Sequence, residues 1–265
     1  MINKCIYLLV TALLLSVLSC VTTPITGKKS LVLIPFSQEV QLGEDAYRDF
    51  LSKEKKNINK DPKINSMVAR ITKNLASKSD MPNLRWQVTV INSKEANAFC
   101  LPGGKMVVYT GIFPLCKNEA GLAAVIGHEM AHAVARHGAQ RMTQQMVLNL
   151  GLSAASISLK NSQYKDLIIA SLGAGSTVGV LLPYSRDNEY EADEIGTIYM
   201  ARAGYDPHEA VSLWQRFSKS GGERPAEFLS THPYSEKRAV ALKNLIPRAM
   251  QEYDKSKKYG TGSNL

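Results

Sequence analysis

The feature that most constrains this chain is a pair of histidines four residues apart, in the segment His128-Glu129-Met130-Ala131-His132. On an α-helix, residues four apart lie on one face, so both imidazoles can bind one metal ion while Glu129 reaches a water molecule on that metal. A catalytic zinc site uses three protein ligands and keeps a fourth position for water. The metal lowers the pKa of that water to about 7, and a neighbouring carboxylate can accept its proton. The segment therefore predicts a catalytic Zn²⁺ site, one ion per chain, with Glu129 as general base.

The residues around this motif are mostly apolar, which predicts a buried helix over residues 119–134. Burying two imidazoles and a carboxylate without a partner costs free energy, and a bound metal removes that cost. His137 follows His132 by five residues, which on a continuous helix rotates it about 140° away. We interpret His137 as a structural residue at the end of the helix, near Gly138.

The third ligand has to come from further along the chain. A thermolysin-like site would supply a glutamate about twenty residues downstream, but no acidic residue lies between His132 and Asp166. The metzincin pattern also fails, because Ala135 stands where that pattern has glycine. The next acidic cluster, SRDNEYEADE at 185–194, is typical of a second helix.

The two motifs together, HExxH and the ExxxD of Glu189 and Asp193, resemble the zinc metallopeptidases of family M48, which include the HtpX protease and the CAAX prenyl endopeptidases. Further segments share this resemblance: NAFCLPGG at 97–104, YTGI at 109–112, and an HPxxxxR element from His232 to Arg238. The resemblance extends over about residues 26–246. It implies an endopeptidase that acts on polypeptides.

The resemblance also implies roles for the acidic residues. Glu189 is the expected third zinc ligand, with Glu191 and Glu194 as competing candidates on the same segment. Asp193 is expected to accept the remaining ring N–H of a ligand histidine.

His232 keeps three interpretations. It donates a hydrogen bond to the developing oxyanion, or it is a displaceable fourth metal ligand, or it is a loop histidine before the last helix, since His-Pro is also a common helix start. Arg186, which precedes the third-ligand helix, either binds substrate carbonyls or pairs with neighbouring acids.

We expect an α+β fold of zincin-like type, mainly helical, with a small β-sheet beside the HExxH helix. The patterns predict helices at about 38–55 and 62–78, strands at about 84–91 and 105–110, and mostly helix after the active helix. We interpret the strand at 107–109 as a sheet edge that holds an extended peptide by main-chain hydrogen bonds. The apolar segment 146–182 is interpreted as buried or lid-like helices over the cleft, with a membrane-touching segment as the alternative.

The N-terminus has the pattern of a bacterial lipoprotein. A basic start, an apolar stretch over residues 6–18 and Cys20 match a signal peptide with a lipobox, which predicts an acylated Cys20 as membrane anchor. A signal that is cleaved conventionally or not at all is the alternative. No Asp follows Cys20, which favours the outer membrane, facing the periplasm. The predicted organisation is a lipoprotein signal peptide at 1–19, a lipid anchor and linker at 20–36, a zinc metallopeptidase domain at 37–250 and a disordered tail at 251–265.

Composition adds two points. Cys100 and Cys116 remain in the mature chain, either as a disulfide or as two buried thiols. The net charge is +9, and we interpret the lysine clusters as solvated surface with no sign of nucleic-acid binding.

Two classes of function follow: an endopeptidase for misfolded or misassembled cell-envelope proteins, or a chaperone-like binding lipoprotein with a structural zinc site. The presence of Glu129 favours the first, because a structural site needs no general base.

Overall fold

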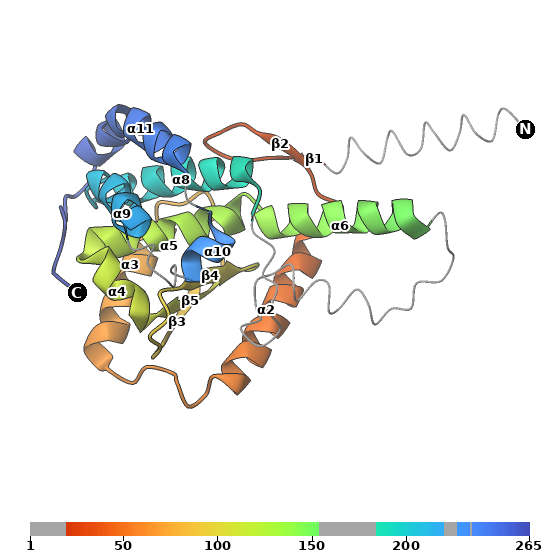
Figure 1. The fold of residues 1–265 in the computed structure, drawn as a ribbon, viewed down its shortest axis with the longest axis horizontal. Helices are drawn as coiled ribbons and strands as arrows, with labels where there is room; N and C mark the ends of the chain where they lie inside the picture. The colour runs from red at the N-terminus through yellow and green to blue at the C-terminus, as the bar shows by residue number, and fades with distance from the viewer. Residues whose placement is uncertain (1–19, 154–183, 220–226, 234) are drawn as a thin grey trace, which may run out of the picture.

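Two helices that cross at a pair of glycines form the centre of the molecule, α5 (Glu119–Val134) and α8 (Arg186–Arg202) (Figure 1). The computed structural model describes residues 20–153, 184–219, 227–233 and 235–265. A Cβ atom on Gly196 would lie 2.7 Å from the backbone nitrogen of His128, and one on Gly127 would lie 2.8 Å from the carbonyl oxygen of Gly196. Only glycine therefore fits at the crossing, and the two helices that carry the sequence motifs touch through their backbones.

Side-chain caps fix where these two helices begin. The Asn118 side chain accepts a hydrogen bond from the N–H of Gly121 at 2.9 Å, and the Ser185 hydroxyl accepts one from Asn188 at 3.2 Å. Both satisfy N–H groups that the first turn of a helix leaves unpaired. Every residue of α5 except Ala133 is buried, as the apolar sequence predicts.

The sheet beside α5 has three strands, β3 (Gln87–Ile91), β4 (Ala98–Leu101) and β5 (Lys105–Tyr109), in the order β3-β5-β4. The central strand β5 is parallel to β3 and antiparallel to β4. The expectation that residues 107–109 form an edge is therefore wrong, because β5 is paired on both sides. β4 packs against α5, and among the described strands it pairs only with β5, on one of its two sides.

The two faces of β5 contact different helices, since successive side chains of a strand point to opposite sides. Met106 and Val108 belong to the core around α5, and Val107 and Tyr109 to the cluster formed with α2 (Phe36–Lys53). The sheet thus lies between α2 and the central helix pair, and both layers position β4.

The remaining elements complete the shell. They are α3 (Pro62–Ala76), the 3-10 turn η1 (Thr110–Ile112), α4 (Phe113–Cys116), α6 (His137–Ser153), α9 (His208–Lys219), α10 (Glu227–Thr231) and α11 (Glu236–Asp254). The α+β zincin-like class is confirmed, and the predicted helices and strands occur within about three residues of their expected bounds. Among the described helices, none combines the length and apolarity needed to cross a membrane.

The chain ends depart from expectation. The predicted linker contains an antiparallel hairpin of β1 (Cys20–Thr22) and β2 (Lys29–Leu31). The expectation of a disordered tail is wrong, because backbone hydrogen bonds join Ser263 to Glu119, Thr261 to Ala120 and Leu265 to Lys117. The predicted signal peptide and most of the 146–182 segment lie outside the described residues.

Candidate metal centre

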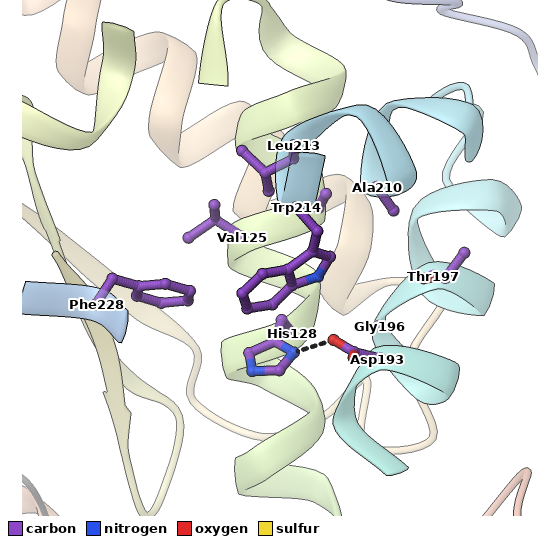
Figure 2. A pocket seen from close by; sticks show the side chains of 10 residues that line it. Val125, His128, Asp193, Gly196, Thr197, Ala210, Leu213, Trp214 and Phe228 are labelled. Atoms are coloured by element: carbon purple, nitrogen blue, oxygen red, sulfur yellow. Dashed lines mark ion pairs between the residues drawn. The ribbon is translucent and has the colours of Figure 1, made fainter. Parts of the chain in front are cut away.

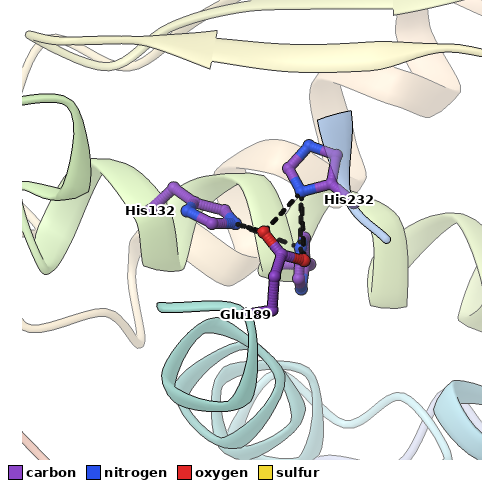
Figure 3. Close-up of side chains that lie close together, drawn as sticks. His132, Glu189 and His232 are labelled. Atoms are coloured by element: carbon purple, nitrogen blue, oxygen red, sulfur yellow. Dashed lines mark hydrogen bonds and ion pairs between the residues drawn. The ribbon is translucent and has the colours of Figure 1, made fainter. Parts of the chain in front are cut away.

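Four buried side chains converge on one point: His128, His132, Glu189 and His232 (Figure 3). One ligand atom from each lies within 4.8 Å of the others. Nε2 of His128 lies 3.1 Å from Nε2 of His132 and 3.2 Å from Nδ1 of His232. Ligands of a tetrahedral zinc ion with bonds of about 2.1 Å lie about 3.4 Å apart. The spacing of these atoms fits one zinc ion.

Glu189 completes the group from the opposite helix. Its Oε2 lies 3.4 Å from His128, its Oε1 lies 3.4 Å from Nε2 of His132, and the same Oε1 lies 3.0 Å from His232. The glycine crossing of α5 and α8 brings this carboxylate to the histidines. Glu191 and Glu194 do not join the group, so among the three candidate carboxylates the geometry favours Glu189.

Arg238 and Asp193 form a second layer behind the metal-binding group. The Arg238 guanidinium contacts both oxygens of Asp193 at 2.7 and 2.8 Å, and its Nη1 lies 2.8 Å from Glu189. Oδ1 of Asp193 lies 3.0 Å from Nδ1 of His128. Arg238 holds the pKa of Asp193 below its usual value, although burial acts to raise it. Asp193 thus lies next to a ring nitrogen of His128, as expected. The role of Arg238 as the partner of Asp193 was not predicted from the sequence.

Aromatic rings close the space around the histidines. The Trp214 and Phe228 rings lie beside His128 and, with Asp193, line a cavity of about 10 Å³, enough for about one water molecule (Figure 2). The Tyr184 ring stacks on His132 with centroids 3.9 Å apart. These contacts restrict both imidazoles to one orientation.

Glu129 lies between the sheet and the metal-binding group. Its Oε2 accepts a hydrogen bond from the backbone N–H of Cys100 at 3.1 Å, and its Oε1 lies 3.2 Å from Nε2 of His232. Burial raises the pKa of Glu129, although the nearby histidines act to lower it. A carboxylate with a raised pKa is suited to accept and hold a proton.

The surroundings shift the pKa values of His128 and His132 in opposite directions. Burial lowers the pKa of His132 well below its usual value, which keeps this ring neutral. Burial also acts to lower the pKa of His128, but its contacts with Asp193 and Glu189 outweigh burial and raise it to about 9. Because ligand imidazoles must be neutral, metal binding has to displace a proton from His128.

His137 is not in the metal-binding group, as expected, but the structure gives it a contact that the sequence analysis missed. The helix breaks at Arg136, which has a φ of 56°, and His137 begins α6 instead of ending α5. Its Nδ1 lies 2.9 Å from Nδ1 of His132, and its Nε2 lies 3.1 Å from Glu191.

The remaining candidates lie apart from the centre. Arg186 is exposed on the first turn of α8, and Glu194 pairs with Arg248 on the surface. Cys100 and Cys116 are two buried thiols and form no disulfide.

Comparison with known proteins agrees with this geometry. The sequence model of peptidase family M48 matches residues 62–246. The mitochondrial metalloendopeptidase OMA1 of Schizosaccharomyces pombe is 35% identical over 241 residues, which cover 89% of this chain and 69% of that protein. OMA1 of Arabidopsis thaliana is 37% identical, over 80% of this chain and 42% of the relative.

A bacterial relative is similar over the same region. The beta-barrel assembly-enhancing protease of Escherichia coli K12 is 28% identical over 84% of this chain and 47% of its own length. The chain thus spans about half the length of several relatives. The family match, the metalloendopeptidase relatives and the compact His/His/Glu/His group lead to one conclusion: this chain belongs to peptidase family M48, the zinc metallopeptidases.

Proposed function

We propose that His128, His132 and Glu189 hold the catalytic zinc ion of an endopeptidase whose general base is Glu129. The observation that carries this proposal is the spacing of the buried ligand atoms, 3.1–3.4 Å among these three residues, with the Glu129 carboxylate directly behind them. Asp193 orients His128 by accepting its Nδ1 proton, and Arg238 keeps Asp193 charged.

When bound, zinc supplies an acidified water molecule and polarises the carbonyl of the scissile peptide bond. Glu129 accepts the proton of the attacking water and delivers it to the leaving amine nitrogen. The Cys100 N–H fixes one oxygen of this carboxylate and leaves the other toward the metal-binding group. The enclosing aromatic rings exclude further water, which strengthens these electrostatic interactions.

The substrate-binding element of this proposal is β4. The Cys100 N–H points from β4 to Glu129, so the side of β4 that has no partner strand faces the catalytic carboxylate. A polypeptide in extended form can add to such an edge through main-chain hydrogen bonds, which read backbone more than side chains. This favours clients that are partly unfolded.

His232 takes the fourth position around the proposed metal. With Nδ1 at 3.0 Å from Glu189 and 3.2 Å from His128, it lies where a ligand lies and where water has to bind during hydrolysis. We propose that it is the displaceable fourth ligand. The interpretation as a helix start is not favoured, because α11 begins four residues later, at Glu236, and its N-cap is Ser235.

We further propose that the protein acts in the bacterial cell envelope, at the outer membrane facing the periplasm, anchored by acyl chains on Cys20. Support comes from the lipobox-like sequence and from the exposed position of Cys20 at the start of the β1–β2 hairpin. A relative named for β-barrel assembly comes from a bacterium. The proposed clients are misfolded or misassembled envelope proteins.

The deciding experiment compares wild type with Glu129→Gln on casein, an unfolded substrate. The variant is expected to keep one zinc ion per chain and to lose roughly 10²–10⁴-fold in kcat, because Glu129 moves the proton without holding the metal. Zinc content is measured by atomic spectroscopy, and Glu194→Gln, on the outer surface of α8, serves as control. Equal casein cleavage by wild type and Glu129→Gln would contradict this mechanism.

A binding or chaperone-like function is the second candidate, because four protein ligands around zinc are typical of a structural site. It predicts that wild type does not cleave casein, that zinc removal unfolds the protein, and that Glu129→Gln suppresses aggregation of an unfolded client as well as wild type does.

A further inference from the structure

The two proposed zinc ligands on α5 are supported differently at their second ring nitrogens. Nδ1 of His128 faces the carboxylate of Asp193 at 3.0 Å. Nδ1 of His132 faces another imidazole, with Nδ1 of His137 at 2.9 Å. Nε2 of His137 in turn lies 3.1 Å from Oε2 of Glu191. On its Nδ1 side, His132 is therefore connected to the Glu191 carboxylate through a second histidine.

This chain of contacts has a single consistent arrangement of protons. If Nε2 of His132 binds the metal, its Nδ1 carries the proton and donates it to Nδ1 of His137. His137 then carries its own proton on Nε2 and donates it to Glu191. All three side chains are buried, so water does not supply alternative partners. The contacts of His137 and Glu191 thus match the tautomer of His132 that presents Nε2 to zinc.

Glu191 is itself held by the loop between β1 and β2. The Thr26 hydroxyl donates to Oε1 of Glu191 at 2.7 Å, and Nζ of Lys28 lies 2.9 Å from Oε2. Lys28 also donates to Oδ1 of the buried Asn188 at 3.2 Å, about one turn before Glu191 on α8. These bonds join residues 165 and 160 positions apart in the chain.

The helix break at Arg136 is what makes the contact with His132. A continuous helix would turn His137 about 140° away from His132. Arg136 adopts a φ of 56° and is fixed there by Glu39 at 2.6 Å and by the carbonyl of Ile34 at 2.7 Å. The break is thus anchored to Ile34, after β2, and to Glu39 on α2, whereas Glu191 is anchored to the β1–β2 loop.

We propose that His137 and Glu191 are positioning residues for the zinc ligand His132. Thr26 and Lys28 bind Glu191 and so attach the β1–β2 hairpin to this pair; we call these two contacts the latch. In this proposal, the attachment of the hairpin sets how tightly zinc is held. The inference rests on the proposed zinc site. It extends that site from the metal to the hairpin that begins at Cys20, a region that the sequence predicts to be a lipid anchor and linker.

The test measures the zinc dissociation constant by competition with a chromogenic chelator, together with the melting temperature of the zinc-free protein. His137→Leu and Glu191→Ala are expected to weaken zinc binding about 10- to 100-fold, the usual effect of losing such a partner. His137→Gln restores an acceptor and a donor in one side chain and is expected to bind zinc within a few-fold of wild type. Glu194→Ala, on the exposed side of α8, is the control and is expected to match wild type.

The latch is tested with the double variant Thr26→Val, Lys28→Met, compared with Lys29→Met on the exposed neighbouring position. The double variant is expected to weaken zinc binding by up to about tenfold, with a faster release of zinc to the chelator, whereas Lys29→Met leaves both unchanged.

The outcomes are distinct. If His137→Leu and Glu191→Ala lower the melting temperature but bind zinc like wild type, these contacts only stabilise the fold and the inference is overturned. An unchanged zinc affinity in the hairpin double variant overturns the latch. If His137→Leu or Glu191→Ala does not fold, His137→Gln and Glu191→Gln provide the comparison with wild type. If both His137 variants fold and bind zinc with equal affinity, the relay from Glu191 through His137 to His132 is contradicted. A wild type that binds no zinc refutes the proposed function instead.

Discussion

In the proposed zinc site, the ring of His232 occupies the position that the attacking water needs, with Nδ1 at 3.0 Å from Glu189 and 3.2 Å from His128. Substituting His232→Ala is therefore expected to raise casein cleavage several-fold with zinc still bound, because three protein ligands remain. Measuring kcat and zinc content together checks this. A fall of roughly 10²–10³-fold would show instead that His232 donates to the oxyanion. No change would place His232 outside the site.

Glu191 makes the stability of the fold depend on pH, and the hydrogen-bond partners of its carboxylate determine the direction of that dependence. Burial acts to raise its pKa, but the hydrogen bonds from His137, Lys28 and Thr26 outweigh burial and lower the pKa to about 2. A carboxylate with a lowered folded-state pKa stabilises the fold above its unfolded pKa of about 4.3, and that stability is lost as the pH falls toward 2.

We therefore expect zinc-free wild type to melt at a higher temperature than zinc-free Glu191→Gln at pH 6, with the difference shrinking between pH 5 and pH 2. Thermal unfolding followed by circular dichroism measures this. A difference that stays constant over that range would show that Glu191 is not charged in the fold.

Single residues of the site were predictable to different degrees. His128, Glu129 and His132 follow from helical spacing alone, because four residues make about one turn. Glu189 could be chosen over Glu191 only by its resemblance to a family motif, since both lie on one acidic helix. The contact between His137 and His132 was not predicted, because the spacing of the two residues was interpreted on a continuous helix. Nothing in the local pattern shows that Arg136 takes a positive φ.

Among the secondary-structure elements, the crossing of α5 and α8 has the most direct effect on the site. Gly196→Ala would place a Cβ atom 2.7 Å from the backbone of Gly127 and His128. The helices have to separate, which is expected to cost about 1–3 kcal/mol in unfolding free energy and to weaken zinc binding, because Glu189 moves with α8. Urea unfolding and chelator competition measure the two effects.

Glu194→Ala tests the same helix without touching the crossing and is the control for this change. If Gly196→Ala unfolds like wild type and binds zinc equally well, the close approach of the two helices does not set the ligand spacing.

Helices were easier to predict than the order of strands. The helix at 62 was expected from its sequence pattern, and Asp61 before Pro62 caps it. The place of β5 between β3 and β4 was not predictable, because its parallel pairing with β3 is a non-local contact that leaves no local pattern.

For the whole molecule, the C-terminal residues 261–265 form backbone hydrogen bonds with the start of α5, the helix that carries the HExxH motif. Ser263 and Thr261 accept hydrogen bonds from the backbone N–H groups of Glu119 and Ala120, and Leu265 donates to Lys117. Removing residues 261–265 is expected to cost about 2–4 kcal/mol of unfolding free energy, at roughly 0.5–1.5 kcal/mol per bond.

Denaturant unfolding of the shortened chain measures that cost. Because the bonds use backbone atoms, Ser263→Ala and Asn264→Ala are the controls and are expected to unfold like the full chain. A shortened chain as stable as these controls would show that the tail contributes nothing. The composition of the tail, rich in Gly, Ser and Thr, favoured disorder, and only the unpaired N–H groups of α5 explain its order.

The edge strand β4 has a consequence for how client proteins are chosen. If clients bind to β4 as proposed, its four residues require a client to present about 13 Å of fully extended backbone, at roughly 3.3 Å per residue. A folded domain presents such a stretch only when it opens locally, and every 1.4 kcal/mol in the free energy of that opening makes the open form about tenfold rarer. Cleavage rates across a set of clients would then rank them by local opening free energy, as amide hydrogen exchange does, and largely irrespective of their sequences.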